Sequence, residues 1–435
     1  MRATTITPFV VASLCASLCA TAAPVVYRAA AIHTVSGESF APGELLVDGG
    51  KLRAVGKTVP RAAAAKVVDL AGLQLYPGLI AAPTSLGLAE ISGVRATVDT
   101  TEVGEFVPDV EAWISVNPDS ELIPVARANG ITHALVAPMG GRVSGVSGLM
   151  QLNGWGVEQM TIQKPVALHL WWPAMQLDTT PKEQLADASK SKSLKEQASE
   201  RAEQLRAIDR FFDDADAYQK ARATGAKDFK KVPAWESVLP FLKGERPIMV
   251  HATEARQITA AVTWAQKRHY KIVLVGAQDA WRVAELLGKH AVPVIYDATF
   301  ELPRRDDDAH DIHFRAPHIL HRAGVPVALC LPMGGWAASE LRNLPYLAAQ
   351  SAAHGLPRAE ALKAITLRPA QFMGVADRLG SLEADKEATF IAVDGDLLDI
   401  RANVKRVWIA GEEVSLESRH TRLFERYKNR PRPRP

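Results

Sequence analysis

Cysteine is scarce in this chain, with three residues in 435, at positions 15, 19 and 330. Cys15 and Cys19 lie in an N-terminal segment that carries the marks of a removable signal. The remaining chain would then keep Cys330 alone and form no internal disulfide. A fold held together by disulfides is therefore excluded.

A large excess of charge of either sign is also missing. The formal net charge is +3, which is too small to indicate binding to nucleic acid or to an anionic membrane. Apolar residues make up 47% of the chain and charged residues 23%, as in ordinary soluble globular proteins. A length of 435 residues predicts two domains.

A long apolar run is absent as well. The apolar segment Phe9–Cys19 is shorter than the roughly 20 residues that span a bilayer, which disfavours an N-terminal membrane anchor. Arg2 precedes this segment and Ala20-Thr21-Ala22 follows it, as in a secretory signal. We therefore predict that residues 1–22 are a signal peptide and that the mature chain is periplasmic or secreted, without a membrane span.

Short strands occur near both ends of the chain. Glu44–Val47 and Leu52–Val55 flank Asp48-Gly49-Gly50, a strong hairpin signal because both glycines tolerate positive φ. The N-terminal strands are too few to bury a core alone, and Thr389–Val414 supplies partners. We predict a small composite β-sandwich domain made of residues 23–76 and 385–418.

Residues 77–384 alternate apolar strands with helical patterns, which is typical of a parallel β/α arrangement. Seven strands are expected, where a closed barrel needs eight; an eighth lies near Met160–Ile162 or the barrel is distorted. The predicted fold class is α/β, a distorted (β/α)8 TIM-like barrel. The expected strands are Leu75–Ile80, Ile131–Ala137, Val166–Leu170, Ile248–His251, Ile272–Val275, Val292–Tyr296 and Val325–Leu329.

Two segments stand apart from this alternation. Residues 182–231 are rich in Lys, Glu, Ala and Gln, with apolar residues at helical spacing, and predict a helical insertion. Three interpretations of this insertion stay open: a helix pair packed on the barrel rim, a lid, or an arm that contacts another copy in an oligomer. Residues 419–435 form a basic tail rich in Pro and Arg, whose end is expected to be disordered because Pro disfavours helix and strand. A solvated tail is the expectation, with binding to an anionic surface as the alternative.

Four motifs carry a family resemblance. Val68–Ile80 reads V-D-x-x-G-x-x-x-x-P-G-L-I, and the others are Arg342–Pro345, Ala361–Ala370 and Gly374–Glu383. In order and spacing they resemble the amidohydrolase superfamily, and most of all its imidazolonepropionase-like branch. The resemblance implies a barrel with a composite β-domain and metal-dependent hydrolysis of C–N bonds in small cyclic amides or peptides.

The ligand positions that this resemblance implies are mostly lost. The family continues as Asp-x-His-x-His, where this chain has Ala81, Pro83 and Ser85. A strand-end histidine is matched by His251, but Gly276 begins the stretch where the next one would sit, and the last strand has no Asp. One imidazole cannot hold Zn²⁺, so the cofactor stays unknown and zinc requires relocated ligands. Candidates for relocation are His133, His169, Asp297, His310, Asp311 and His313.

Several residues are nevertheless expected at the barrel mouth. His251 and Asp297 end strands, where barrel sites lie, and are the predicted catalytic pair; His251 with His169 is the predicted metal pair. The glycine-rich stretch 140–148 offers Arg142 and Ser144 for substrate binding, unless it is only a tight turn. Arg304 is a second expected anion contact.

Two functions remain open from the sequence. The first is an exported hydrolase of C–N bonds with a degenerate metal site, acting through relocated ligands or without metal around His251 and Asp297. The second is a non-catalytic relative that binds a small molecule or pairs with an intact amidohydrolase. A homo-oligomer is compatible with either function.

Overall fold

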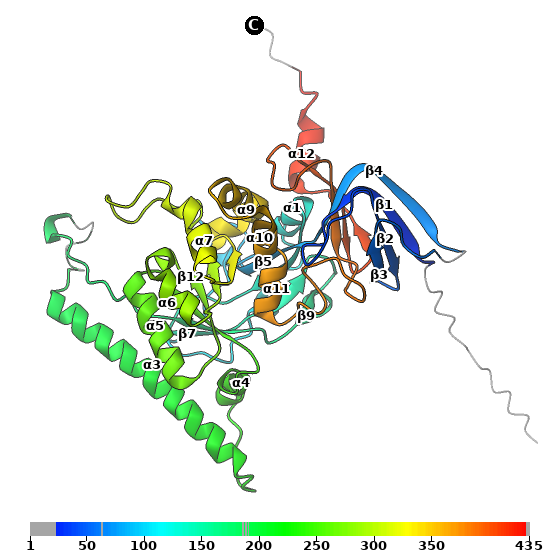
Figure 1. The fold of residues 1–435 in the computed structure, drawn as a ribbon. Helices are drawn as coiled ribbons and strands as arrows, with labels where there is room; N and C mark the ends of the chain where they lie inside the picture. Colours follow the sequence, from blue (N-terminus) through cyan, green and yellow to red (C-terminus); the bar gives the residue numbers. More distant parts are fainter. Residues whose placement is uncertain (1–22, 62–63, 185–186, 188, 190, 432–435) are drawn as a thin grey trace, which may run out of the picture.

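The computed structural model describes residues 23–61, 64–184, 187, 189 and 191–431. The predicted signal peptide, residues 1–22, lies outside this part. Figure 1 shows a β-domain, drawn in blue and orange-red, beside a larger α/β body. The predicted fold class is confirmed, with strands from both chain ends in the β-domain. No helix of the described residues is long and apolar enough to cross a membrane.

The composite domain is one seven-stranded sheet in the order β17-β16-β15-β4-β1-β2-β3. The N-terminal and C-terminal parts meet where β15 pairs antiparallel with β4. Gly49 and Gly50 have φ of 58° and 74°, as the predicted hairpin requires. The strands are β1 Val25–Ile32, β2 Gly43–Asp48, β3 Lys51–Gly56, β4 Lys66–Pro77, β15 Phe390–Val393, β16 Val404–Ile409 and β17 Glu412–Val414.

An aromatic cluster joins the two chain ends within this sheet. Tyr27 from β1 makes edge contacts with Phe390 and Trp408, at ring-centroid distances of 5.2 and 5.1 Å. Phe390 and Trp408 stack at 4.5 Å. Phe390 and Trp408 are fully buried and Tyr27 nearly so, so apolar burial and ring contacts stabilise the composite arrangement.

The larger body contains seven parallel strands, in agreement with the sequence prediction. They fall into two sheets, β5-β6-β8-β9 and β14-β13-β12-β11-β10-β7. The parallel strands are β5 Leu79–Thr84, β6 Ile131–Val136, β10 Leu168–Trp171, β11 Ile248–Ala252, β12 Ile272–Gly276, β13 Val294–Tyr296 and β14 Val327–Leu329. The added antiparallel strands are β7 Val143–Val146, β8 Gly148–Gln151 and β9 Thr161–Gln163.

The distortion of the barrel has a local origin. β7 pairs with β10 and β8 pairs with β6, and only Ser147 separates β7 from β8. This excursion therefore passes directly from one sheet to the other where a regular barrel would place another parallel strand. One apolar cluster fills the interior between the sheets, as in a packed barrel; it includes Ile80, Leu135, Met249, Val273, Ile295 and Ala328.

Helices cover the outside of this body (Figure 1). The α-helices are α1 Leu122–Ala128, α2 Val157–Met160, α3 Leu194–Ala223, α4 Pro233–Leu242, α5 Ala255–Arg268, α6 Ala284–Lys289, α7 Ile312–Arg322, α8 Gly335–Glu340, α9 Leu344–Ala353, α10 Arg358–Ala364, α11 Leu367–Met373 and α12 Arg419–Tyr427. The short 3₁₀ helices are η1 Arg95–Thr97, η2 Ala112–Ser115, η3 Lys182–Gln184, η5 Ala280–Val283 and η6 Leu341–Asn343.

The helical insertion is dominated by α3, which runs for 30 residues along the outside (Figure 1). Ser193 and Glu196 form a capping box at its start. Phe211 and Phe212 are buried, and Phe212 contacts Trp264 of α5 with ring centroids 4.9 Å apart. This half of α3 packs on the body, as expected for a helix on the rim.

Gly78 marks the junction between the composite domain and the barrel. It lies between β4 and β5, and its N–H donates to the carbonyl of Thr389 at 3.2 Å. A Cβ at this position would lie 2.6 Å from Cγ2 of Thr132 and 2.8 Å from Cγ2 of Thr389. Only glycine therefore leaves room for these two threonine side chains, which explains its place in the Pro77-Gly78-Leu79-Ile80 motif.

We expect Gly78→Ala to lower the free energy of unfolding by about 1–3 kcal/mol, the usual cost of overpacking a filled site. Gly93→Ala is the matched control, because nothing lies within 4 Å of a Cβ built there. Urea unfolding of both variants and the parent chain, followed by tryptophan fluorescence, measures the difference. Equal midpoints for the two variants would contradict the close approach.

Candidate functional site

A cavity of ≈ 250 Å³ opens where the parallel strands end. Its walls come from five successive parallel strands or from the residues that follow them, and include Trp171, His251, Gly276, Asp297, Pro332 and Met333. The carboxyl ends of barrel strands are where enzymes of this architecture carry their sites. We therefore place the candidate site here.

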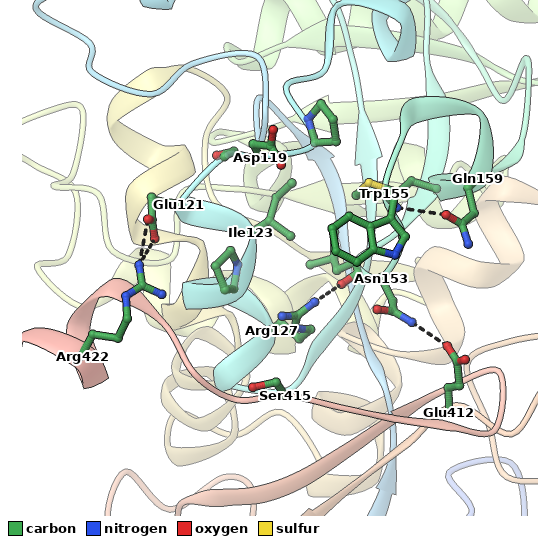
Figure 2. Close-up of a pocket in the computed structure, with 16 residues that line it drawn as sticks. Asp119, Glu121, Ile123, Arg127, Asn153, Trp155, Gln159, Glu412, Ser415 and Arg422 are labelled. Carbon is green, nitrogen blue, oxygen red and sulfur yellow. Dashed lines mark hydrogen bonds and ion pairs between the residues drawn. The ribbon is translucent and has the colours of Figure 1, made fainter. Parts of the chain in front are cut away.

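A larger cavity, of ≈ 620 Å³, shares no lining residue with this one. It lies beside α1 and the C-terminal segment, with Arg127, Trp155 and Glu412 in its walls (Figure 2). None of the strand ends that form the barrel mouth contributes to it, so size alone does not identify the site.

Two histidines meet beneath the mouth. β10 and β11 are paired in parallel, and Nδ1 of His169 lies 2.9 Å from Nε2 of His251. Burial lowers the pKa of His169 to about 3 and the pKa of His251 well below its usual value. Both rings are therefore neutral at physiological pH, and a single hydrogen bond joins them.

The direction of this hydrogen bond follows from its surroundings. Nε2 of His169 is buried and has no partner among the described residues. A buried N–H without an acceptor is rarer than a buried lone pair without a donor. We therefore assign the proton of His169 to Nδ1, which donates to Nε2 of His251. His251 then carries its own proton on Nδ1.

An indole covers the His251 ring. Trp171 stacks on His251 with centroids 3.8 Å apart and an angle of 10° between planes. Its Nε1 donates to Oγ of Ser144 at 3.1 Å, and that hydroxyl donates to the carbonyl of Pro138 at 3.3 Å. Ser144 is thus a buried support for the indole. Trp171 was not predicted from the sequence, although it follows His169 by two residues and so shares its face of the strand.

Asp297 is the second predicted catalytic residue, and it lines the same cavity as His251. Desolvation by burial, and then the negative charge of Glu301, raise its pKa to about 7. A Cβ at Gly276 would lie 3.8 Å from both Oδ2 of Asp297 and Oγ1 of Thr253, so the absent side chain leaves room between them. A carboxyl with this pKa is suited to exchanging protons near neutral pH.

The donor set does not fit a zinc ion. Zn²⁺ in hydrolases takes three protein ligands and a water, yet in the part of the chain described no three His, Cys, Asp or Glu side chains lie together as a metal site. Nε2 of His251 is engaged by His169. Ser85, at a lost ligand position, accepts a hydrogen bond from the N–H of Gly334 at 3.1 Å. Pro83 has no donor atom in its side chain.

The other relocation candidates have different roles. His133 is fully buried with Nδ1 3.0 Å from Oγ1 of Thr132. His313 lies on α7 with Nδ1 2.7 Å from the hydroxyl of Tyr296. Asp311, the residue before α7, forms an ion pair with Arg315 of that helix at 3.5 Å.

The predicted substrate-binding residues do not line the cavity. Nη1 of Arg142 approaches the carbonyl of Trp171 at 3.5 Å, and its Nε lies 3.7 Å from Glu105. Arg304 is 4.0 Å from Glu254 on the rim. With Ser144 buried under Trp171, these three side chains surround the site rather than face its interior.

The sequence leaves the glycine-rich stretch 140–148 open to two uses, ligand binding or a tight turn. Much of it forms β7 and the start of β8. A Cβ at Gly145 would lie 2.7 Å from Cβ of Val110, and one at Gly141 would lie 2.6 Å from the carbonyl oxygen of Gly104. The missing side chains of these glycines thus make room for the segment 104–110, which packs closely against this stretch.

Comparison with known proteins shows which family this chain resembles. The model of the amidohydrolase family matches residues 158–414. A curated relative, amidohydrolase tasK of Hapsidospora irregularis, is 23% identical over 429 residues, covering 87% of this chain and 41% of the relative. The chain thus spans about two fifths of the length of that relative.

Solved structures share the fold. An amidohydrolase from Thermotoga maritima MSB8 matches with a TM-score of 0.78 and 24% identity, covering 90% of this chain and 99% of that one. A prolidase solved in complex with N-methylphosphonate-L-proline matches with a TM-score of 0.54 and 14% identity, covering 90% and 99%. At these identities the likeness concerns the fold, whereas the family model spans more than half of the sequence. The chain belongs to the amidohydrolase family.

Proposed function

We propose that this chain is an exported hydrolase that cleaves a C–N bond of a small cyclic amide or short peptide at the barrel mouth, without a catalytic zinc. The observation that carries the proposal is Asp297, whose pKa of about 7 suits it to proton transfer in the cavity that it shares with His251. Export is supported by the signal-like segment 1–22. A peptide substrate is in keeping with the prolidase fold relative.

The proposed reaction uses one carboxyl twice. Ionised Asp297 takes a proton from a water molecule, whose oxygen bonds to the carbonyl carbon of the amide. The carboxyl then returns this proton to the leaving nitrogen as the C–N bond breaks. Nδ1–H of neutral His251 is the group proposed to donate a hydrogen bond to the carbonyl oxygen, where negative charge develops.

The rate enhancement that this site can provide is limited. General acid–base catalysis contributes about 10²–10⁴-fold, and without a metal there is no Lewis acid to lower the barrier further. We therefore expect turnover far slower than that of a zinc hydrolase, with activated or strained amides as the best substrates.

A second function is favoured by one contact. The hydrogen bond between His169 and His251 satisfies the nitrogen that a metal would need, which suits a cavity kept for binding rather than turnover. In that case the chain is a non-catalytic relative that binds the same small amides without cleaving them. It would act alone, as a homo-oligomer or as the partner of an intact amidohydrolase.

Asp297→Asn should abolish proton transfer while keeping the size of the side chain. We expect kcat/KM to fall by about a hundredfold or more against the best substrate of a panel of cyclic amides and dipeptides, with ligand affinity retained. Product release followed by mass spectrometry, and calorimetric binding, are the measurements. Binding without turnover by the parent chain would favour the second function, and neither binding nor turnover would rule out both.

The pH dependence offers an independent test. If ionised Asp297 is the base, kcat/KM rises with pH through about 7. Glu301→Gln removes a negative charge that raises this pKa, so the rising limb should move to lower pH. Glu158→Gln, an exposed acid outside the site, is the control. A profile that Glu301→Gln leaves in place would refute the assignment to Asp297.

Zinc binding can be measured apart from activity. After incubation with Zn²⁺ and gel filtration, we expect far less than one metal per chain, because the described donors do not form a three-ligand set. His251→Ala should leave this content unchanged. About one zinc per chain, lost in His251→Ala, would show instead that the site is rebuilt around His251.

A further inference from the structure

The C-terminal segment concentrates the positive charge of the chain. Residues 419–435 contain seven Lys or Arg and one Glu, a net charge of +6, whereas the whole chain carries +3. The rest of the molecule is therefore net negative. A whole-chain average hides this local excess, which is large enough to attract an anionic surface.

Part of this segment is the amphipathic helix α12, whereas the last residues, 432–435, for which disorder is predicted, lie outside the described residues. Ser418 caps α12, with Thr421 completing the capping box. The first proline of residues 419–435 is Pro431, which lies beyond the end of α12, so no proline interrupts the helix. In Figure 1, α12 lies at the edge of the molecule near α1.

One polar contact holds α12 against the barrel. Arg422 pairs with both carboxylate oxygens of Glu121, at 2.8 and 3.0 Å (Figure 2). No residue of α12 is buried. This ion pair ties the helix to the barrel, and the apolar side chains of the helix stay partly exposed.

These side chains form a stripe. Leu423, Phe424 and Tyr427 follow helical spacing and are 39%, 66% and 49% exposed. A nine-residue helix is marginally stable in water by itself, and none of the apolar side chains of this one is fully buried. An exposed apolar stripe on a basic helix is the usual arrangement of helices that lie on a membrane surface.

We propose that α12, with the basic residues that follow it up to Arg430, docks this protein on an anionic lipid bilayer. The stripe Leu423, Phe424 and Tyr427 would enter the headgroup region, and Arg426 and Lys428 would contact the lipid phosphates. The stripe favours lipid over nucleic acid, because a polyanion needs only the charges. This inference concerns a surface outside the barrel mouth and does not depend on the proposed function.

Vesicle sedimentation tests the proposal with the full mature chain. We expect binding to vesicles of phosphatidylglycerol and phosphatidylcholine in equal parts, no binding to phosphatidylcholine alone, and weakening with salt. Arg426→Gln with Lys428→Gln should weaken binding by about tenfold or more. Lys227→Gln with Lys230→Gln removes the same charge from another exposed segment and should change nothing.

A second variant separates lipid docking from attraction of charge alone. Phe424→Ser with Tyr427→Ser keeps every cation and should also weaken binding by about tenfold or more, since apolar insertion is lost. Tryptophan fluorescence checks that both variants keep the parent fold. Unchanged binding of the serine variant, or equal binding to both kinds of vesicle, would overturn the proposal.

Discussion

The close approach at Gly78 is the contact on which the rest of the arrangement depends. The chain leaves the composite sheet through β4 and enters the barrel through β5 with a single residue between them. Thr389, which leads back into the sheet from the far end of the chain, and Thr132 of the neighbouring barrel strand both pack where a side chain would be. One missing Cβ thus lets three distant segments meet, and the two domains share a junction without a linker.

The chemistry of the mouth is governed by desolvation rather than by ion pairs. Burial holds His169 and His251 neutral through lowered pKa values and raises the pKa of Asp297 into the neutral range. A buried divalent cation would oppose the second effect alone, because it stabilises carboxylates, whereas it also binds imidazoles in their neutral form. Among the described residues, burial sets the direction of each of these pKa shifts.

How far the sequence predicts this structure depends on the range of the contacts involved. Short apolar runs predict the parallel strands because both faces of such strands are buried, and the Asp48-Gly49-Gly50 hairpin follows from turn chemistry alone. β7 escapes prediction because glycine weakens the strand signal, and its pairing with β10 is visible only in three dimensions. His251 and Asp297 are predictable as strand-end residues, whereas the stacking of Trp171 and its support by Ser144 are not.

The survival of the barrel without its ligands has a physical basis. The apolar cluster that holds the strands together includes Met249 and Ile295, which lie on the same strands as the site but below it. Ligand positions such as Pro83, Ser85 and Gly276 are at or beyond strand ends, so their replacement leaves this cluster intact. A set of buried charged ligands without metal would cost desolvation free energy. Replacement of the other ligand positions is therefore compatible with the fold, because the one matching histidine, His251, has a hydrogen-bond partner in His169.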